Sequence, residues 1–367
     1  MTLTLAPMDV AGRIPRLRAL LAAAGLPAIL VTRRANVQYL TGFTGSAGSL
    51  FVSPDDTLLV TDGRYRTQSA EQVAAAQVEA RVEIGLTMSD QRELLAAAAR
   101  GAATVGLEEH SITWAEQRDF VRAFEGIEVV PAGTPVENLR RVKDAGEIDR
   151  IRAACAIASE AFEALLPRLG DGITEREFAL ALEFGMRERG ASGNSFDPII
   201  ASGPNGAKPH ARPSDRVIGR NELVVCDFGC IVDDYCSDMT RTVSVGDPGP
   251  DARRLYDVVL ESQRVGRDAV AADVVCADVD RATRAVIAEA GWAEEFSHST
   301  GHGVGLEIHE APRVASTARD TLLVSDVVTV EPGVYLPGVG GVRIEDTVVV
   351  TATGAEPLTL TSKELVL

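Results

Sequence analysis

The chain has 367 residues, and its 46% hydrophobic and 24% charged content is that of an ordinary globular protein with room for about two domains. A formal net charge of −17 opposes binding to a phosphate backbone and no basic stripe compensates for it, so we expect no nucleic-acid partner. No apolar run approaches the roughly 18–20 residues of a membrane span. Five cysteines, an odd number in a chain of this length, argue against a disulfide framework, and we expect a cytoplasmic protein.

The N-terminal part of the chain alternates between helix and strand patterns. Ile14, Leu17 and Leu21 share one helical face ahead of Gly25, which can end that helix. Pro54-Asp55-Asp56 separates two short apolar runs, as in a β-hairpin. Helices are expected at 13–24, 65–77, 89–100 and 113–124, and strands at 28–32, 50–53, 57–61, 78–84, 103–109 and 126–131. This alternation predicts an α/β domain over residues 1–135.

A second domain is expected over residues 136–367, after a linker at 131–135 that is rich in proline and glycine. It opens with a long amphipathic helix, and Thr174-x-x-Glu177 then forms a capping box for the next one. Its helices are expected at 148–169, 174–190, 251–271 and 278–290, and its strands lie in two blocks, 195–245 and 297–350.

Two aspartates in the first strand-rich block predict a cation site. Residues 223–245 indicate two strands around a turn at Asp233-Asp234, so Asp227 faces Thr240, because each lies six residues from the nearer turn residue. Asp238 then lies diagonally beside Asp227 on the same face, at about 7–8 Å. Carboxylates that reach across such a gap can hold two cations about 3.5–4 Å apart. The alternative is that both aspartates are ordinary turn residues.

The second strand-rich block supplies histidines. Three of the five histidines in the chain, His298, His302 and His309, lie within it. Glycines around His302 argue against a helix and allow close backbone approach to something bound. The glycine spacing fits neither a P-loop nor a dinucleotide fingerprint, and His309-Glu310 lacks the second histidine of a helical HExxH zinc site.

Charged residues also interrupt apolar strand patterns in this block. Glu331 ends an apolar run before Pro332-Gly333, and Arg343 and Glu345 share one face of a strand expected at 342–350. A single such charge would suggest a structural ion pair, whereas four carboxylates with clustered histidines favour a metal site, because a bare buried carboxylate is costly. A site of four carboxylates and one imidazole suits Mn²⁺ or Co²⁺ better than structural zinc, with Zn²⁺ as the alternative.

Together these residues resemble the family of aminopeptidase P, prolidase and methionine aminopeptidase, and the resemblance covers nearly the whole chain. It implies an α/β N-terminal domain plus an α+β pita-bread catalytic domain. It also implies two divalent metal ions, held by five ligands: Asp227, Asp238, His302, Glu331 and Glu345.

The N-terminal domain indicates which members of this family the chain resembles most. Residues 36–46 and 61–65 resemble the extra domain of Xaa-Pro peptidases and creatinase, which minimal methionine aminopeptidases lack. Creatinase works without metal, and non-enzymatic relatives serve as histone-chaperone modules. Five intact ligands disfavour both, and a peptide- or histone-binding relative is retained only as a remote alternative.

The resemblance also implies roles around the metals. His210, after Pro209, and His309 would bind the substrate and the developing oxyanion, or pass a proton to the leaving nitrogen. Glu331 would shuttle a proton. His298, Arg313 and Arg343 complete the expected substrate-binding set, with Arg343 as a partner of the ligands.

The expected reaction is hydrolysis of the bond before proline in a di- or oligopeptide. We favour a dipeptidase (prolidase) over an aminopeptidase P that acts on longer peptides. A dipeptidase needs a cation for the nearby substrate carboxylate, and Arg313 is the first candidate because arginine binds carboxylates bidentately. The other candidates are Arg33, Arg34 and Arg64. We also expect a homodimer.

Overall fold

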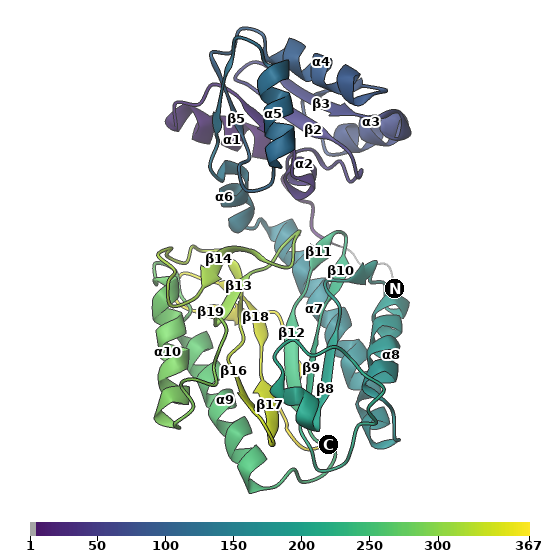
Figure 1. Cartoon of the computed structure of the whole chain (residues 1–367), viewed down its shortest axis with the longest axis vertical. Helices are drawn as coiled ribbons and strands as arrows, with labels where there is room; N and C mark the ends of the chain where they lie inside the picture. The colour runs from purple at the N-terminus through teal and green to yellow at the C-terminus, as the bar shows by residue number, and fades with distance from the viewer. Residues whose placement is uncertain (1–4) are drawn as a thin grey trace. The chain divides into compact units, whose positions relative to one another are not determined.

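We describe residues 5–367 of a computed structural model (Figure 1). They form two compact units, Met8–Arg140 and Arg141–Leu367, and residues 5–7 belong to the second unit. The division lies five residues beyond the expected one, because Pro135 starts helix α6 (Pro135–Arg141), which continues the first unit. Proline is well suited to the first position of a helix, where its missing N–H costs no hydrogen bond. In the described residues, no helix is long and apolar enough to cross a membrane.

The first unit is built on one six-stranded mixed sheet, in the order β4-β3-β2-β1-β5-β6. Its strands are β1 (Ile29–Val31), β2 (Ser49–Val52), β3 (Thr57–Thr61), β4 (Arg81–Ile84), β5 (Thr104–Leu107) and β6 (Glu128–Pro131). Its other helices are α1 (Arg13–Ala23), α2 (Arg34–Thr41), α3 (Arg66–Ala75), α4 (Met88–Ala99) and α5 (Trp114–Ala123). The α/β prediction is confirmed, but α2 was not expected, because only eight residues carry its pattern.

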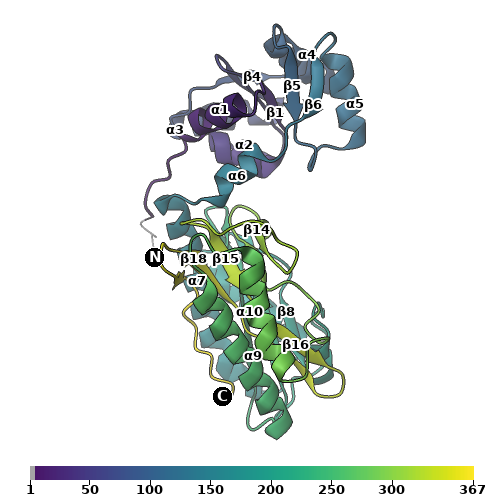
Figure 2. The same ribbon diagram turned by 90° about the vertical axis from the view of Figure 1, so that its left-hand side faces the viewer.

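The second unit places a pair of helices on each side of its strands. α7 (Ala145–Leu165) and α8 (Glu175–Glu188) lie on one side, and α9 (Pro250–Ala269) and α10 (Cys276–Glu289) on the other (Figure 1). Figure 2 shows α9 and α10 running side by side. On the first side, Phe162 packs against Phe178 and Phe228, with ring centroids 6.4 and 5.1 Å away. The capping box predicted at Thr174 and Glu177 opens α8.

The strands between the helix pairs form several small sheets. Beside α7 and α8 lie β7 (Gly193–Asn194), β8 (Ile199–Ser202), β9 (Val224–Phe228), β10 (Cys230–Val232), β11 (Tyr235–Cys236) and β12 (Met239–Val243). They form two three-stranded sheets, β12-β9-β8 and β11-β10-β7. The other half holds β13 (Gly301–Gly303), β14 (Glu310–Val314), β15 (Val327–Val330), β16 (Gly333–Leu336), β17 (Gly340–Arg343), β18 (Asp346–Val350) and β19 (Ala355–Pro357). Their sheets are β14-β13-β15-β18-β19 and β16-β17.

The hairpin predicted around Asp233-Asp234 has the expected register. Asp227 pairs with Thr240 across β9 and β12. Asp233 and Asp234 have φ of 47° and 70°, the positive values that a tight two-residue hairpin turn requires. The ribbon breaks into two ladders at Gly229, where a Cβ would lie 1.9 Å from the carbonyl oxygen of Ser237. A glycine is therefore required at that break.

One expectation about the second block is wrong in detail. Residues 342–350 are not one strand, because β17 and β18 belong to different sheets and the chain between them crosses to β12, where the Glu345 N–H donates to Thr240 O at 3.1 Å. At the two glycines beside His302, neighbouring backbone takes the space that a side chain would fill. A Cβ at Gly301 would lie 2.0 Å from Thr329 O, and one at Gly303 would lie 2.2 Å from Ala311 O.

Candidate metal centre and substrate cavity

One cavity of about 1140 Å³ in the second unit is lined by all ten residues of the expected metal and substrate site, but not by the other candidates Arg33, Arg34 and Arg64. The ten residues are His210, Asp227, Asp238, His298, His302, His309, Arg313, Glu331, Arg343 and Glu345. They come from segments that are up to 135 residues apart in the chain, and the fold brings all of them to the wall of the same cavity.

Four of the five predicted metal ligands lie at the end of a strand or between two strands, and His302 lies in β13 beside a register shift. Asp227 lies near the end of β9, and Asp238 directly precedes β12. Glu331 directly follows β15, His302 is the middle residue of β13, and Glu345 occupies the crossing between β17 and β18. Strand ends let these side chains leave the ladders and point into the cavity, while the strands hold their backbones.

The ligand atoms lie close together. The His302 Nε2 atom is 3.3 Å from Glu331 Oε1 and 3.5 Å from Asp238 Oδ2. One ligand atom each from Asp238, His302 and Glu345 lie within 4.8 Å of one another. Thr240 Oγ1 donates to Glu345 Oε2 at 2.7 Å, and His302 Nδ1 is 3.1 Å from Gly303 O. The contact to Gly303 O assigns the proton to Nδ1 and leaves Nε2 available as a ligand.

Two buried oxygen atoms of this cluster lack a hydrogen-bond partner among the described residues. They are Asp227 Oδ1 and Glu345 Oε1. Buried carboxylate oxygens are expensive to leave unsatisfied, so both atoms fit a cation. Oxygen donors with a single imidazole are the ligand set that Mn²⁺ and similar ions accept.

The shifted pKa values of the cluster also favour a bound cation. Burial and then the charge of Asp227 raise the pKa of Asp238 well above its ordinary value. Burial and then the charges of Asp238 and Glu331 do the same for the pKa of Glu345. Burial lowers the pKa of His302, but the hydrogen bond to Glu331 and the charges of Glu331 and Asp238 together outweigh it and raise that pKa to about 9. Divalent cations need these groups deprotonated, so their binding would release protons.

Arg343 forms an ion pair with the Asp227 carboxylate. Its guanidinium donates to Asp227 Oδ2, to Tyr335 Oη at 2.6 Å and to Pro209 O at 3.2 Å. The side chain is buried, and these protein acceptors engage it, which favours the role of ligand partner over direct substrate contact. Tyr335, which the sequence analysis did not single out, also contacts His298 Nε2 at 2.9 Å.

Three histidines surround the cluster in different environments. His309 is exposed at the cavity, and its ring lies edge-on to His302 with centroids 4.4 Å apart. Burial and then the charge of His302 lower the pKa of His309. His210 is also exposed, whereas His298 is held by Tyr335 and by Ser299 O. His210 and His309 are therefore the histidines that a substrate can reach.

Arg313 lies on the same side of the sheet as His302. The two residues pair directly across β13 and β14, and directly opposed residues point to the same face. Arg313 is exposed, lines the cavity, and has no hydrogen-bond or ion-pair partner within residues 5–367. A free guanidinium beside the ligands is available to a substrate anion.

Glu175 is a residue that the sequence analysis missed. Its fully buried carboxylate accepts the N–H and hydroxyl of Ser202, at 2.7 and 2.8 Å, and those of Ser214, at 3.1 and 2.6 Å. These hydrogen bonds hold Ser202 and Ser214, the two ends of the segment that carries His210. Glu175 follows the capping Thr174, and the sequence signal was only that of an acidic first turn of a helix.

We expect Glu175→Gln to lower the free energy of unfolding at pH 7 by about 1.5–3 kcal/mol, the contribution of a hydrogen bond to a charged group. Burial raises the pKa of Glu175, but the hydrogen bonds from Ser214 and Ser202 outweigh it and hold that pKa below the ordinary value of 4.5. A lowered folded-state pKa stabilises the fold above 4.5 and loses that effect as pH falls through the folded value. The difference between wild type and variant in urea unfolding should therefore shrink from pH 7 to pH 3, and a constant difference would contradict this account.

Comparison with known proteins identifies the family. Residues 149–352 match the model of metallopeptidase family M24, and residues 13–142 match the creatinase/prolidase N-terminal domain. The chain belongs to metallopeptidase family M24. The predicted resemblance and the fold class are confirmed.

Three relatives cover almost the whole chain. An Xaa-Pro dipeptidase of Pyrococcus horikoshii is 35% identical over 93% of this chain and 95% of its own. The structure of an Xaa-Pro dipeptidase from Bacillus anthracis matches with a TM-score of 0.93 at 38% identity, over 98% of this chain and 100% of that one. The structure of an X-Pro aminopeptidase from Thermotoga maritima matches with a TM-score of 0.85 at 36% identity, over 94% and 98%.

Proposed function

We propose that this protein is a dinuclear metallopeptidase that hydrolyses the Xaa-Pro bond and prefers dipeptides. The observation that carries the proposal is the convergence of four carboxylates and one imidazole on one cavity. The names of the relatives support the Xaa-Pro specificity, and two of the three are dipeptidases. Aminopeptidase P activity on longer peptides is the second candidate, which the Thermotoga relative favours.

The proposed ligands are Asp227, Asp238, His302, Glu331 and Glu345, and we favour Mn²⁺ over Co²⁺ and Zn²⁺ because oxygen donors dominate. Two bound divalent ions would lower the pKa of water towards about 7 and so supply a nucleophile at neutral pH. The partnerless oxygens of Asp227 and Glu345 support this ligand set.

The protein groups around the ligands would orient the substrate and move protons. Glu331, which faces His302 at 3.3 Å, would take the proton of the attacking water. His309 and His210, exposed at the cavity, would bind the carbonyl oxygen as its charge develops, or protonate the leaving imide nitrogen of proline. Arg343 would keep Asp227 in place, and His298 would shape the wall beside Tyr335.

Substrate length would be read by Arg313. In an Xaa-Pro dipeptide the terminal carboxylate follows the scissile bond by one residue, whereas each further residue moves it by up to about 3.3–3.6 Å. An exposed guanidinium without a protein partner would bind the nearer carboxylate by a charge-assisted, bidentate contact.

We expect Arg313→Ala to raise KM for an Xaa-Pro dipeptide about 10-fold or more and to change KM for the tripeptide much less, because a hydrogen bond to a charged group is worth about 1.5–3 kcal/mol. Arg212→Ala is the matched control, since Arg212 is another exposed arginine of the cavity. Equal effects of Arg313→Ala on both substrates would mean that Arg313 supports the site rather than the substrate.

The function itself is tested by comparing rates under Mn²⁺, Co²⁺ and Zn²⁺ on an Xaa-Pro dipeptide, an Xaa-Pro-Xaa tripeptide and an Xaa-Ala dipeptide. A prolidase cleaves the first fastest, and an aminopeptidase P cleaves the second fastest. Preference for Xaa-Ala would contradict the proline specificity.

Two further properties belong to the proposal. The five cysteines are all buried thiols without disulfides, which is the pattern of a reducing compartment and supports a cytoplasmic location. We also propose a homodimer, which sedimentation of the purified protein would test.

A further inference from the structure

A buried charged cluster lies behind the candidate ligands, outside the cavity lining. Its centre is Arg241 in β12, whose side chain is 1% exposed. Arg241 follows Asp238 by three residues, and its neighbour Thr240 donates to the Glu345 carboxylate. Arg241, Asp346, Gln263 and Lys363 are all absent from the cavity wall, so none of them can touch a substrate there.

The Arg241 guanidinium joins backbone segments that are distant in sequence. Its Nη1 donates to Thr240 O at 2.9 Å and to Glu345 O at 2.6 Å. Its Nη2 and Nε donate to Thr361 O at 2.7 and 3.2 Å. The planar guanidinium has fixed donor directions, so these carbonyl groups are held in one arrangement.

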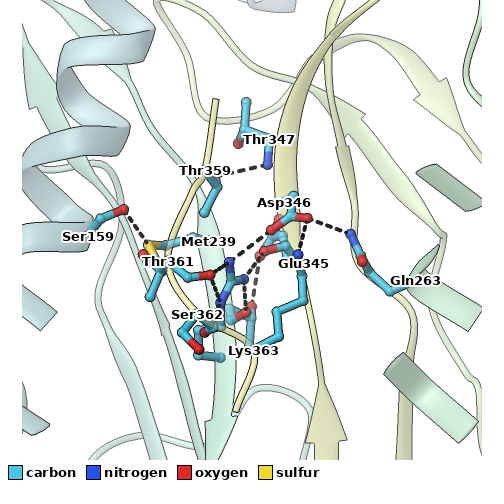
Figure 3. Close-up of polar contacts among 12 residues, drawn as sticks. Ser159, Met239, Gln263, Glu345, Asp346, Thr347, Thr359, Thr361, Ser362 and Lys363 are labelled. Atoms are coloured by element: carbon cyan, nitrogen blue, oxygen red, sulfur yellow. Dashed lines mark hydrogen bonds and ion pairs between the residues drawn. The ribbon is translucent and has the colours of Figure 1, made fainter. Parts of the chain in front are cut away.

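Asp346 completes the cluster from the opposite side. Its Oδ1 accepts from Arg241 at 2.9 Å. Its Oδ2 accepts from Gln263 of α9 at 2.9 Å and pairs with Lys363 at 2.7 Å. Figure 3 shows Gln263 and Lys363 converging on Asp346 from different parts of the chain. Because Asp346 follows Glu345 directly, these contacts fix the chain crossing that bears this ligand.

Thr347 extends the same support to Asp238. Its hydroxyl donates to Asp238 O at 2.8 Å, while its N–H donates to Thr359 Oγ1 at 3.2 Å. The Leu358 N–H donates to Thr347 O at 2.9 Å. The segment 358–363 is therefore bonded to the residues that hold the backbones of both Asp238 and Glu345.

We propose that Arg241 is a positioning residue, which holds the backbones of Glu345 and Asp238 in place before metal binds. Asp346 and Lys363 act with it. Carboxylates crowded into a buried site repel one another, so the backbone that carries them needs to be held in place. Arg241 provides that restraint by bonding to the Glu345 carbonyl and to segment 358–363 at once. This inference rests on the metal site of the proposed function.

The test is the affinity of metal-depleted full-length protein for Mn²⁺ by calorimetry and for Co²⁺ by its absorption spectrum, at a temperature well below the unfolding of every variant. We expect Arg241→Met to weaken both affinities about 10–100-fold, the usual cost of losing a group that supports a metal ligand. Arg241→Lys, which keeps the charge but not the planar donors, should fall between Arg241→Met and wild type.

The matched control is Arg141→Met. Arg141 forms a partly buried ion pair, with Asp326 at 2.8 Å, and donates to the carbonyl of Thr321, but it bonds no backbone group of a proposed ligand. It should lower the unfolding temperature and keep the wild-type metal affinity. Wild-type affinity in Arg241→Met, or an equal loss in Arg141→Met, would overturn the inference.

If Arg241→Met does not fold, Lys363→Met is the variant that tests whether the cluster supports metal binding. The Lys363 side chain is 22% exposed and pairs with Asp346, so its loss should weaken Mn²⁺ binding by about 10-fold, the lower end of the range. Unchanged affinity in this variant would count against the inference. Failure of the wild-type protein to bind Mn²⁺ or Co²⁺ would instead contradict the proposed function.

Discussion

Glu345→Ala is expected to reduce Xaa-Pro peptidase activity by more than about 10³-fold while the protein remains folded. Two bound divalent ions would lower the pKa of water from 15.7 to about 7, and removal of a proposed ligand such as Glu345 would remove most of that effect. Glu345 lies in a group of buried carboxylates that includes Asp238, so its loss also relieves repulsion in the metal-free protein. We expect the variant to melt at or above the temperature of metal-free wild type.

The measurement is turnover together with the melting temperature, with and without Mn²⁺. Mn²⁺ should raise the melting temperature of wild type, since a ligand that binds only the folded state stabilises it, and should raise that of Glu345→Ala much less. Glu345→Gln is the control for size, because it can keep a contact with Thr240 without the charge. Unchanged activity in Glu345→Ala would make Glu345 a structural residue and the ligand assignment wrong.

His309→Ala is expected to lower kcat about 10²–10⁴-fold, the range for a group that transfers a proton in the transition state. His309 is exposed at the cavity beside His302, but it is not among the groups that form the carboxylate cluster. The metal content of the variant should therefore equal that of wild type.

His210→Ala provides the comparison, since His210 is the other exposed histidine of the cavity. The checks are kcat and KM on an Xaa-Pro dipeptide and elemental analysis of both variants. Loss of metal from His309→Ala would reassign this histidine to the ligands. Wild-type kcat in both variants would remove the histidines from the proton-transfer step.

The register of the Asp227 hairpin was predictable because a local feature determines it. Two adjacent aspartates at positive φ make a two-residue turn, and the turn sets every pair of the ribbon that follows. The end of β15 at Glu331 was predictable for a similar reason, since Pro332 and Gly333 interrupt the apolar run. Local signals of this kind predicted that these two proposed ligands lie in or next to strands.

The crossing at Glu345 was not predictable from the same pattern. Alternation of apolar and charged residues across 342–350 describes one face of a strand but not its partner strand. The change of sheet depends on hydrogen bonds to Thr240, which lies 105 residues away. Arg241 was missed for the same reason, because all of its partner carbonyls except that of Thr240 lie 104 to 121 residues away in the chain.

Glu175 and Tyr335 show a further limit. An acidic residue after a capping threonine is ordinary at the start of a helix, and nothing local marks Glu175 as the acceptor for Ser202 and Ser214. Tyr335 lies in an apolar strand pattern, and its contact with Arg343 appears only when β16 and β17 pair. Tertiary contacts, rather than residue type, assign both residues to the site.

If bound metal makes this cavity a peptidase, protein stripped of metal with a chelator should not hydrolyse an Xaa-Pro dipeptide. Elemental analysis of the same sample establishes that the metal is gone. We expect no turnover by the stripped protein and recovery of turnover on addition of Mn²⁺ or Co²⁺. Full turnover by protein shown to be metal-free would contradict this role of the metal.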